Sequence, residues 1–75
     1  KIFYDKISDT LTVEFGHIRK NVELAMFNLA GAECLNHRYQ DISCFSKKLS
    51  ALSPSQMYVC KIIADNQVIV EKISK

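Results

Sequence analysis

The residues of this 75-residue chain best suited to chemistry are its three cysteines and two histidines. Two residues separate Cys34 from His37, and Cys44 lies seven positions after His37. Cys60 and His17 are further candidates to complete a four-ligand zinc site. Structural zinc sites usually bring their ligands in close pairs, and this sequence offers only one such pair. The alternative is a set of free thiols, because cysteine packs as a small hydrophobic residue. We therefore predict no metal and no cofactor, and the zinc alternative stays open for the structure.

Nucleophilic catalysis is the second chemistry that these side chains suggest. A thiolate of Cys34 or Cys44 with His37 or His17 as its base has the required residue types. No local motif accompanies them, and no segment indicates an oxyanion hole. The two glycines lie fifteen positions apart, so the chain has no glycine-rich phosphate loop. We predict that the chain is not an enzyme.

Basic side chains raise the alternative of nucleic-acid binding. The net charge is +2, and residues 38–75 carry six Lys or Arg against three Asp or Glu. The candidates for phosphate contacts are Arg38, Lys47, Lys48 and Lys61. Dedicated nucleic-acid modules usually show a dense basic stripe, whereas these residues are isolated or paired. Nucleic acid is therefore the alternative partner and a protein is the leading one.

The first third of the chain has the pattern of paired strands. Leu11, Val13 and Phe15 alternate with polar residues, which is typical of a strand with one buried face. Residues 2–4 are also strand-prone, and the polar segment 5–9 suits a turn, so we expect a hairpin. Residues 21–29 fit either a third strand or a helix, and we favour the strand. We expect Gly16 to mark a bulge in the hairpin.

The segment from residue 33 to residue 49 predicts an amphipathic helix. Its apolar residues are spaced by four, three, three and four positions, which places them on one face of a 3.6-residue helix. These residues are Leu35, Tyr39, Ile42, Phe45 and Leu49.

A second helix is predicted for residues 54–73. Ser53 suits the N-cap, Pro54 the first helical position and Gln56 the closing position of a capping box. The apolar stripe that follows gathers on one side of a helix and consists of Val59, Ile62, Ile63, Asn66, Ile69, Val70 and Ile73. The rival interpretation is a hairpin that turns at residues 64–67, because both flanking segments are rich in β-branched residues.

Asn66 lies in the middle of this stripe. In heptad terms Val59, Asn66 and Ile73 share one position, where a buried Asn can pair with its copy on a neighbouring helix and fix the register. The stripe would then be a dimer interface. The alternative is that it packs on the domain's own sheet, because two heptads are short for a coiled coil.

The run Leu52-Ser53-Pro54-Ser55-Gln56, with the spacing of Ile62 and Ile69, resembles the short helical BESS-type interaction segment of some chromatin and transcription proteins. The resemblance covers about a third of the chain and implies a helix used for protein contacts. The strand-like first half has no counterpart there, so we assign the chain to no family.

Together these patterns predict an α+β fold, with a small antiparallel sheet of two or three strands in residues 1–29 packed against helices at 33–49 and 54–73. We expect one domain over residues 1–75, because a chain this short builds only one core, and we expect this domain to be a fragment of a larger protein. The odd cysteine count favours a reducing, intracellular setting, cytoplasmic or nuclear. No apolar stretch approaches the ~20 residues of a membrane span. The expected function is protein–protein interaction or self-association, with a homodimer as one form.

Overall fold

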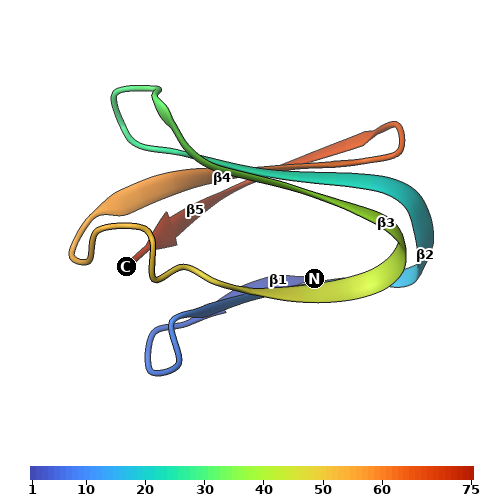
Figure 1. The fold of residues 1–75 in the computed structure, drawn as a ribbon, viewed down its shortest axis with the longest axis horizontal. Helices are drawn as coiled ribbons and strands as arrows, with labels where there is room; N and C mark the ends of the chain where they lie inside the picture. Colours follow the sequence, from blue (N-terminus) through green and yellow to red (C-terminus); the bar gives the residue numbers. More distant parts are fainter.

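The computed structural model describes residues 1–75 and shows a single antiparallel sheet that curls over on itself (Figure 1). Strands hold 72% of the residues, and the chain forms no helix. Because there is no helix, no segment is a long apolar helix of the kind that crosses a membrane. The five strands are β1 (Ile2–Asp5), β2 (Thr10–Phe27), β3 (Glu33–Lys48), β4 (Met57–Ala64) and β5 (Gln67–Ser74).

The long strand β2 organises the sheet. Along one edge it pairs with β3 over most of its length. Along the other edge its first part, Thr10–Val13, pairs with β1, and its last part, Val22–Phe27, pairs with β4. Strand β5 pairs only with β4 and ends the sheet. The bent β2–β3 ribbon therefore contributes to two layers, one carrying β1 and the other carrying β4 and β5 (Figure 1).

The bend lies where the register between β2 and β3 shifts. Glu14 pairs with Cys44 and Arg19 pairs with Ile42, so β2 advances five positions while β3 advances two. The three extra residues of β2 form a bulge that bends the strand. Gly16, inside this bulge, has a φ of 83°, a conformation that glycine adopts without steric cost.

The bulge also reverses the alternation of β2. An excess of three residues is odd, and side chains alternate between faces with a period of two. The core-facing residues of β2 are therefore odd-numbered before the bulge and even-numbered after it. They are Leu11 and Val13 on one side and Val22, Leu24 and Met26 on the other.

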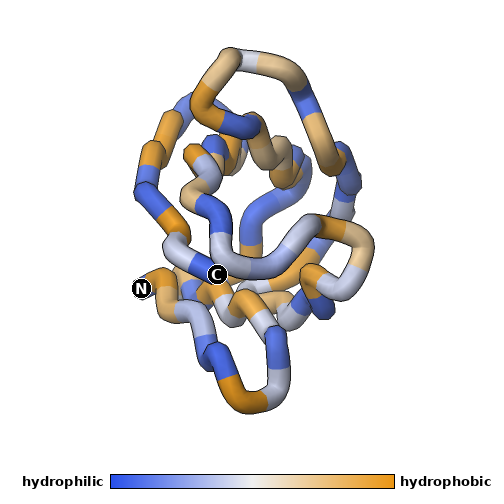
Figure 2. Tube along the Cα trace, turned by 90° about the vertical axis from the view of Figure 1, so that its left-hand side faces the viewer, coloured by the Kyte–Doolittle hydropathy of each residue, from blue (hydrophilic) through white to orange (hydrophobic).

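The core lies between the two layers. All 14 buried residues are hydrophobic, and the largest fully buried side chains include Leu11, Leu24, Met26 and Ile62. Viewed end-on in Figure 2, the strands surround this core, and hydrophobic and hydrophilic positions alternate along them. Burial on one face with polar residues on the other is the arrangement that stabilises an antiparallel sheet.

The predicted helix at 33–49 is wrong, because these residues form β3. Leu35 and Tyr39 lie opposite Met26 and Val22 on the core side, and Phe45 lies opposite Val13. A step of four keeps two residues on the same face of a strand as well as on the same face of a helix. The two steps of three, around Ile42, coincide with the bend, where Asp41 has a φ of 56°. The helical period is thus strand alternation interrupted by a bend.

The predicted helix at 54–73 is also wrong, and the hairpin that competed with it is the structure that forms. Strands β4 and β5 pair in a continuous register from Met57–Ser74 to Ala64–Gln67, which leaves Asp65 and Asn66 as the turn. The expected cap lies in the connection before β4, where the carbonyl of Ser53 accepts a hydrogen bond from the Tyr58 hydroxyl (3.0 Å). The resemblance to a helical interaction segment fails for the same reason, and the fold is all-β rather than α+β.

Candidate interaction surface

The stripe expected to form one interface is divided between two faces of the β4–β5 hairpin. Ile62, Ile69 and Ile73 point to the core side, where Ile62 and Ile73 are buried. Asn66 sits in the turn, so its expected role in fixing the register of a helix pair is wrong. The remaining members, which lie on the opposite side of the hairpin, are Val59, Ile63 and Val70.

This opposite side, which we call the outer hairpin face, is apolar for most of its length. In register order it consists of the pairs Met57–Ser74, Val59–Lys72, Lys61–Val70 and Ile63–Val68. Its most exposed apolar members are Val68, at 57%, and Val70, at 59%. Isolated apolar residues are ordinary on protein surfaces, but a contiguous group is typical of an interaction site.

Strand β5 adds a free backbone edge beside these valines. The N–H of Lys75 donates to the carbonyl of Gln56 on the β4 side (2.9 Å). Because backbone groups of successive strand residues point to alternate sides, those of Ile73, Glu71 and Ile69 also face β4. The N–H and C=O groups of the even-numbered residues Val68 to Ser74 therefore point away from the sheet, and β5 has no neighbour there.

The other free edges of the sheet are less open to a partner strand. Strand β1 has only four residues. The free edge of β3 is bent at Asp41 and carries several charged residues along its length. Short edges, bends and charges are the devices by which proteins block strand addition. Strand β5 has eight residues, a continuous register and two exposed valines, so it is the edge best suited to pairing.

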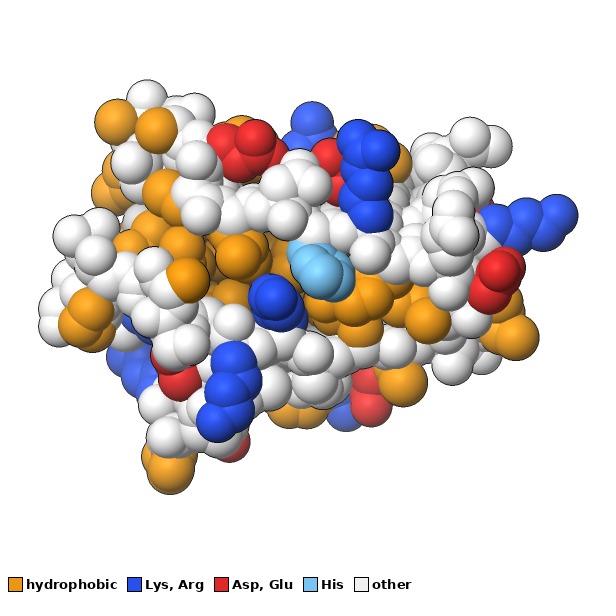
Figure 3. Space-filling view, viewed as in Figure 1, with side chains coloured by type: hydrophobic (Ala, Val, Ile, Leu, Met, Phe, Trp, Pro, Cys, Tyr) orange, Lys and Arg blue, Asp and Glu red, His pale blue; other side chains and the backbone are white.

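Aromatic side chains form a row along the inner side of β3. The ring of Tyr39 stacks on Phe45 with centroids 4.4 Å apart and contacts His37 at 4.6 Å. Phe15 adjoins Phe45 at 6.4 Å, and the Arg19 guanidinium lies 5.4 Å from the Phe15 centroid. Hydrophobic atoms are visible in the hollow between the layers on the face that Figure 3 shows. Because the rings contact one another, most of their faces are occupied, which favours a packing role over ligand stacking.

A shallow cavity of about 250 Å³ lies between the outer side chains of β2 and β3 and the β4–β5 turn. Its acidic groups already have partners. Glu23 accepts a hydrogen bond from the Asn36 amide (2.8 Å), and Asp65 accepts the backbone N–H of Asn21 (3.0 Å). These contacts hold the turn against β2, so we assign the cavity a structural role.

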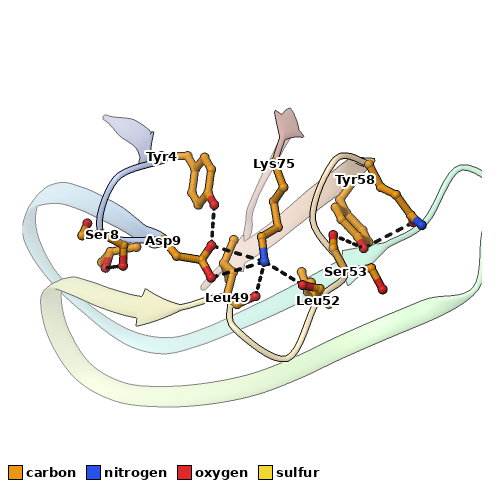
Figure 4. A network of polar contacts seen from close by, with 10 residues as sticks. Tyr4, Ser8, Asp9, Leu49, Leu52, Ser53, Tyr58 and Lys75 are labelled. Carbon is orange, nitrogen blue, oxygen red and sulfur yellow. Dashed lines mark hydrogen bonds and ion pairs between the residues drawn. The ribbon is translucent and has the colours of Figure 1, made fainter.

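A polar cluster fixes the end of β5 (Figure 4). The ammonium of Lys75 donates to the carbonyls of Leu49 (2.5 Å) and Leu52 (2.7 Å) and forms an ion pair with Asp9 (3.3 Å). The Tyr4 hydroxyl donates to the same carboxylate. With 6% of its side chain exposed and three acceptors, Lys75 is fully engaged. The cluster anchors β5, and Tyr4, Asp9 and Lys75 are all engaged in it.

The basic residues proposed for nucleic acid do not share one surface. Lys47 lies opposite Leu11 on the core side of the sheet, whereas the adjacent Lys48 lies opposite Thr10 on the other side. Arg38 on β3 and Lys61 on β4 lie on the same outer side of their layer, but β2 runs between them, and the carboxylate-bearing Glu23 lies next to Arg38. Phosphate binding that is tight and salt-dependent needs several cations along one track. This arrangement supports nucleic-acid binding less than the sequence did.

The cysteines and histidines are likewise dispersed, and no three His, Cys, Asp or Glu side chains are grouped to hold a metal ion. Cys34 and Cys44 are exposed thiols on β3, and Cys60 is buried in the core. Burial, with a smaller contribution from Glu71, raises the pKa of the Cys60 thiol to about 12. A thiol with such a pKa is protonated at neutral pH and is a poor nucleophile.

Sequence reasoning named Val59, Ile63 and Val70 of the outer hairpin face but missed Met57 and Val68. The signal for Val68 was present, because Val68, Val70 and Lys72 alternate with Ile69, Glu71 and Ile73. Only a strand interpretation of the segment turns that alternation into two faces.

The sequence matches no protein-family model, and no curated protein is significantly similar to it.

Proposed function

We propose that this domain is a protein-interaction module that binds its partner through the outer hairpin face and the free edge of β5. The observation that carries the proposal is the pair of exposed valines, Val68 and Val70, beside a regular strand whose outward backbone groups have no neighbour. An added strand would supply hydrogen bonds to the edge, and its side chains would cover the valines.

The charges around this face indicate the chemistry of a fitting partner strand. Lys61 and Lys72 are the charged residues of the outer hairpin face. A fitting partner strand places an apolar side chain opposite Val70 and no cation opposite Lys72, because like charges directly opposite each other destabilise a strand pair. The three free thiols fit the expected intracellular setting, in which cysteines remain reduced.

Nucleic-acid binding is the weaker candidate, because its four basic residues do not form one track: Lys47 lies on the core side, and β2 separates Arg38 from Lys61. Enzymatic activity has less support, because Tyr4, Asp9 and Lys75 in the hollow beside β1 are already bonded to one another. A protein partner therefore accounts best for the exposed apolar surface.

Site-specific photo-crosslinking tests the proposal. A photoreactive phenylalanine analogue is placed at Val68 of the chain expressed in its own cells, and the adducts are identified by mass spectrometry. The matched control carries the same analogue at Ser43, an exposed residue of β3, which pairs with neither β4 nor β5.

We expect one dominant protein adduct when the analogue is at position 68. The same adduct should be absent when the analogue is at position 43. The adduct should disappear when Val70 is also replaced by Lys, because a charge then interrupts the apolar surface. Absence of any protein adduct at position 68, or the same adducts at both positions, would contradict the proposal.

A further inference from the structure

We propose that the partner on β5 is a second copy of this chain, paired antiparallel β5 to β5 about a two-fold axis at Val70. This inference rests on the proposed function, because it names the partner of the same surface. It follows from which backbone groups are free and from where the charges of β5 lie.

The free backbone groups restrict the possible registers. Only the even-numbered residues of β5 direct their N–H and C=O groups outward, as the Lys75–Gln56 hydrogen bond establishes. Opposed residues in an antiparallel pair either both exchange hydrogen bonds or both do not. Even-numbered residues must therefore face even-numbered residues, which prevents Glu71 of one copy from facing Lys72 of the other.

The charges of β5 select among the registers that remain. A two-fold axis at Glu71 or at Lys72 would set two like charges directly opposite each other, which destabilises a strand pair. An axis at Ile69 also avoids this clash, but it keeps only two outward pairs within β5, whereas an axis at Val70 avoids the clash and keeps three. Val70 then faces Val70 of the second copy, Val68 faces Lys72, and Ile69 faces Glu71.

The Val70 register uses the exposed valines fully. The three outward pairs, Val68 with Lys72, Val70 with Val70 and Lys72 with Val68, can each exchange two backbone hydrogen bonds. Val68 and Val70 of the two copies form one row across the dimer interface. The alkyl part of each Lys72 can cover the opposite Val68. A strand that complements itself in one register needs no other partner to satisfy its edge.

The central position can be tested by charge reversal, because in this register Val70 faces its own copy. Val70→Glu and Val70→Lys should each weaken dimerisation by about tenfold or more, since each places like charges opposite each other. An equimolar mixture of the two variants should form a heterodimer at close to the wild-type strength. Sedimentation velocity across micromolar to near-millimolar concentrations measures all three associations.

The register is tested by the same substitution two positions earlier. Val68→Glu would face Lys72 of the second copy, so it should leave dimerisation unchanged or tighten it, whereas Val70→Glu weakens it. Circular dichroism and the thermal midpoint of each variant check the fold, and both valines are exposed enough to tolerate substitution.

A wild-type chain that stays monomeric throughout would overturn the inference, as would equal weakening by Val68→Glu and Val70→Glu. The interaction function and the identity of the partner as a second copy can fail separately. If the chain is monomeric but position 68 still crosslinks a different protein, the interaction function stands and the second copy is wrong. If position 68 crosslinks nothing, both are wrong.

Discussion

Lys75 and Asp9 form an ion pair at 3.3 Å although 66 positions separate them in the sequence. Asp9 lies in the turn between β1 and β2, and Lys75 directly follows β5, the last strand of the other layer. The pair therefore links the two layers of the curled sheet. It also fixes the end of the strand that carries the proposed interaction edge.

Replacing Lys75 with Met should lower the free energy of unfolding by about 1–3 kcal/mol, because the carbonyls of Leu49 and Leu52 would lose their donor. Urea denaturation measures the change. Lys72→Met is the matched control, because Lys72 is exposed and should alter stability by less than about 0.5 kcal/mol. Equal effects of the two substitutions would contradict the structural role of Lys75.

Acid should destabilise the wild-type chain more than a variant without the Asp9 carboxylate. The hydrogen bond from the Tyr4 hydroxyl, followed by the hydrogen bond and charge of Lys75, holds the pKa of Asp9 below its ordinary value of 3.8. A carboxyl whose folded pKa is depressed stabilises the fold above its unfolded pKa, and this contribution is lost as the pH falls through the folded pKa. Thermal midpoints should therefore fall more steeply below pH 3.8 for the wild type than for Asp9→Asn. Parallel curves would refute this linkage.

Alkali should reveal the opposite linkage at Tyr4. Burial, followed by the hydrogen bond to Asp9 and the charges of Asp9 and Asp5, raises the pKa of Tyr4 from 10.0 to about 12. A raised folded pKa gives stability that is present below pH 10 and is lost as the pH rises toward 12. Tyr4→Phe should therefore lose less stability than the wild type across this range, as followed by circular dichroism. A steeper loss for the variant would count against the assignment.

The three thiols should differ in reactivity. Cys34 and Cys44 are exposed, whereas Cys60 is buried with a pKa of about 12. Iodoacetamide at mildly alkaline pH should therefore alkylate two thiols of the folded chain rapidly and the third only after urea unfolds it. Intact-mass measurements count the additions. Rapid labelling of all three thiols would show that the β4 side of the core opens readily.

The turn between β4 and β5 should depend on Asp65. This residue has a φ of 52°, and its carboxylate accepts the backbone N–H groups of Asn21 (3.0 Å) and Lys20 (3.4 Å). Asp65→Ala removes both acceptors and introduces a residue that disfavours positive φ, so it should lower the free energy of unfolding by about 1–3 kcal/mol. Asp65→Asn keeps an acceptor oxygen and tolerates the conformation, so it should lose less. Chemical denaturation of both variants compares them.

The hairpin of residues 1–15 was predictable because its information is local. Leu11 and Val13 alternate with polar neighbours, and the polar turn lies between strands that pair directly. Only one of the two exposed valines of β5 was predicted from the sequence as an interface residue. Val70 was named, but as part of a helical face, and Val68 was left out because on a helix it falls outside the stripe.

Strand β3 and the β4–β5 hairpin were mispredicted because apolar spacing does not reveal bends and turns. The steps from Leu35 to Tyr39 and from Phe45 to Leu49 suit a strand, and only the bend near Asp41 produces the intervening threes. In the C-terminal segment, Ile62 and Ile69 face the core while Ile63 and Val70 face outward, so two faces were counted as one stripe.

The sequence alone determined an N-terminal hairpin with a polar turn at residues 5–9 and enough apolar side chains for one core, and it offered the turn at residues 64–67 only as the rival of a helix. The tertiary structure alone decided which apolar residues beyond the N-terminal hairpin face that core. The physical reason is that strand pairing is non-local. The bulge at residues 15–18 forms against β3 and reverses the alternation of β2, and the partner strand, rather than the local spacing, fixes each face.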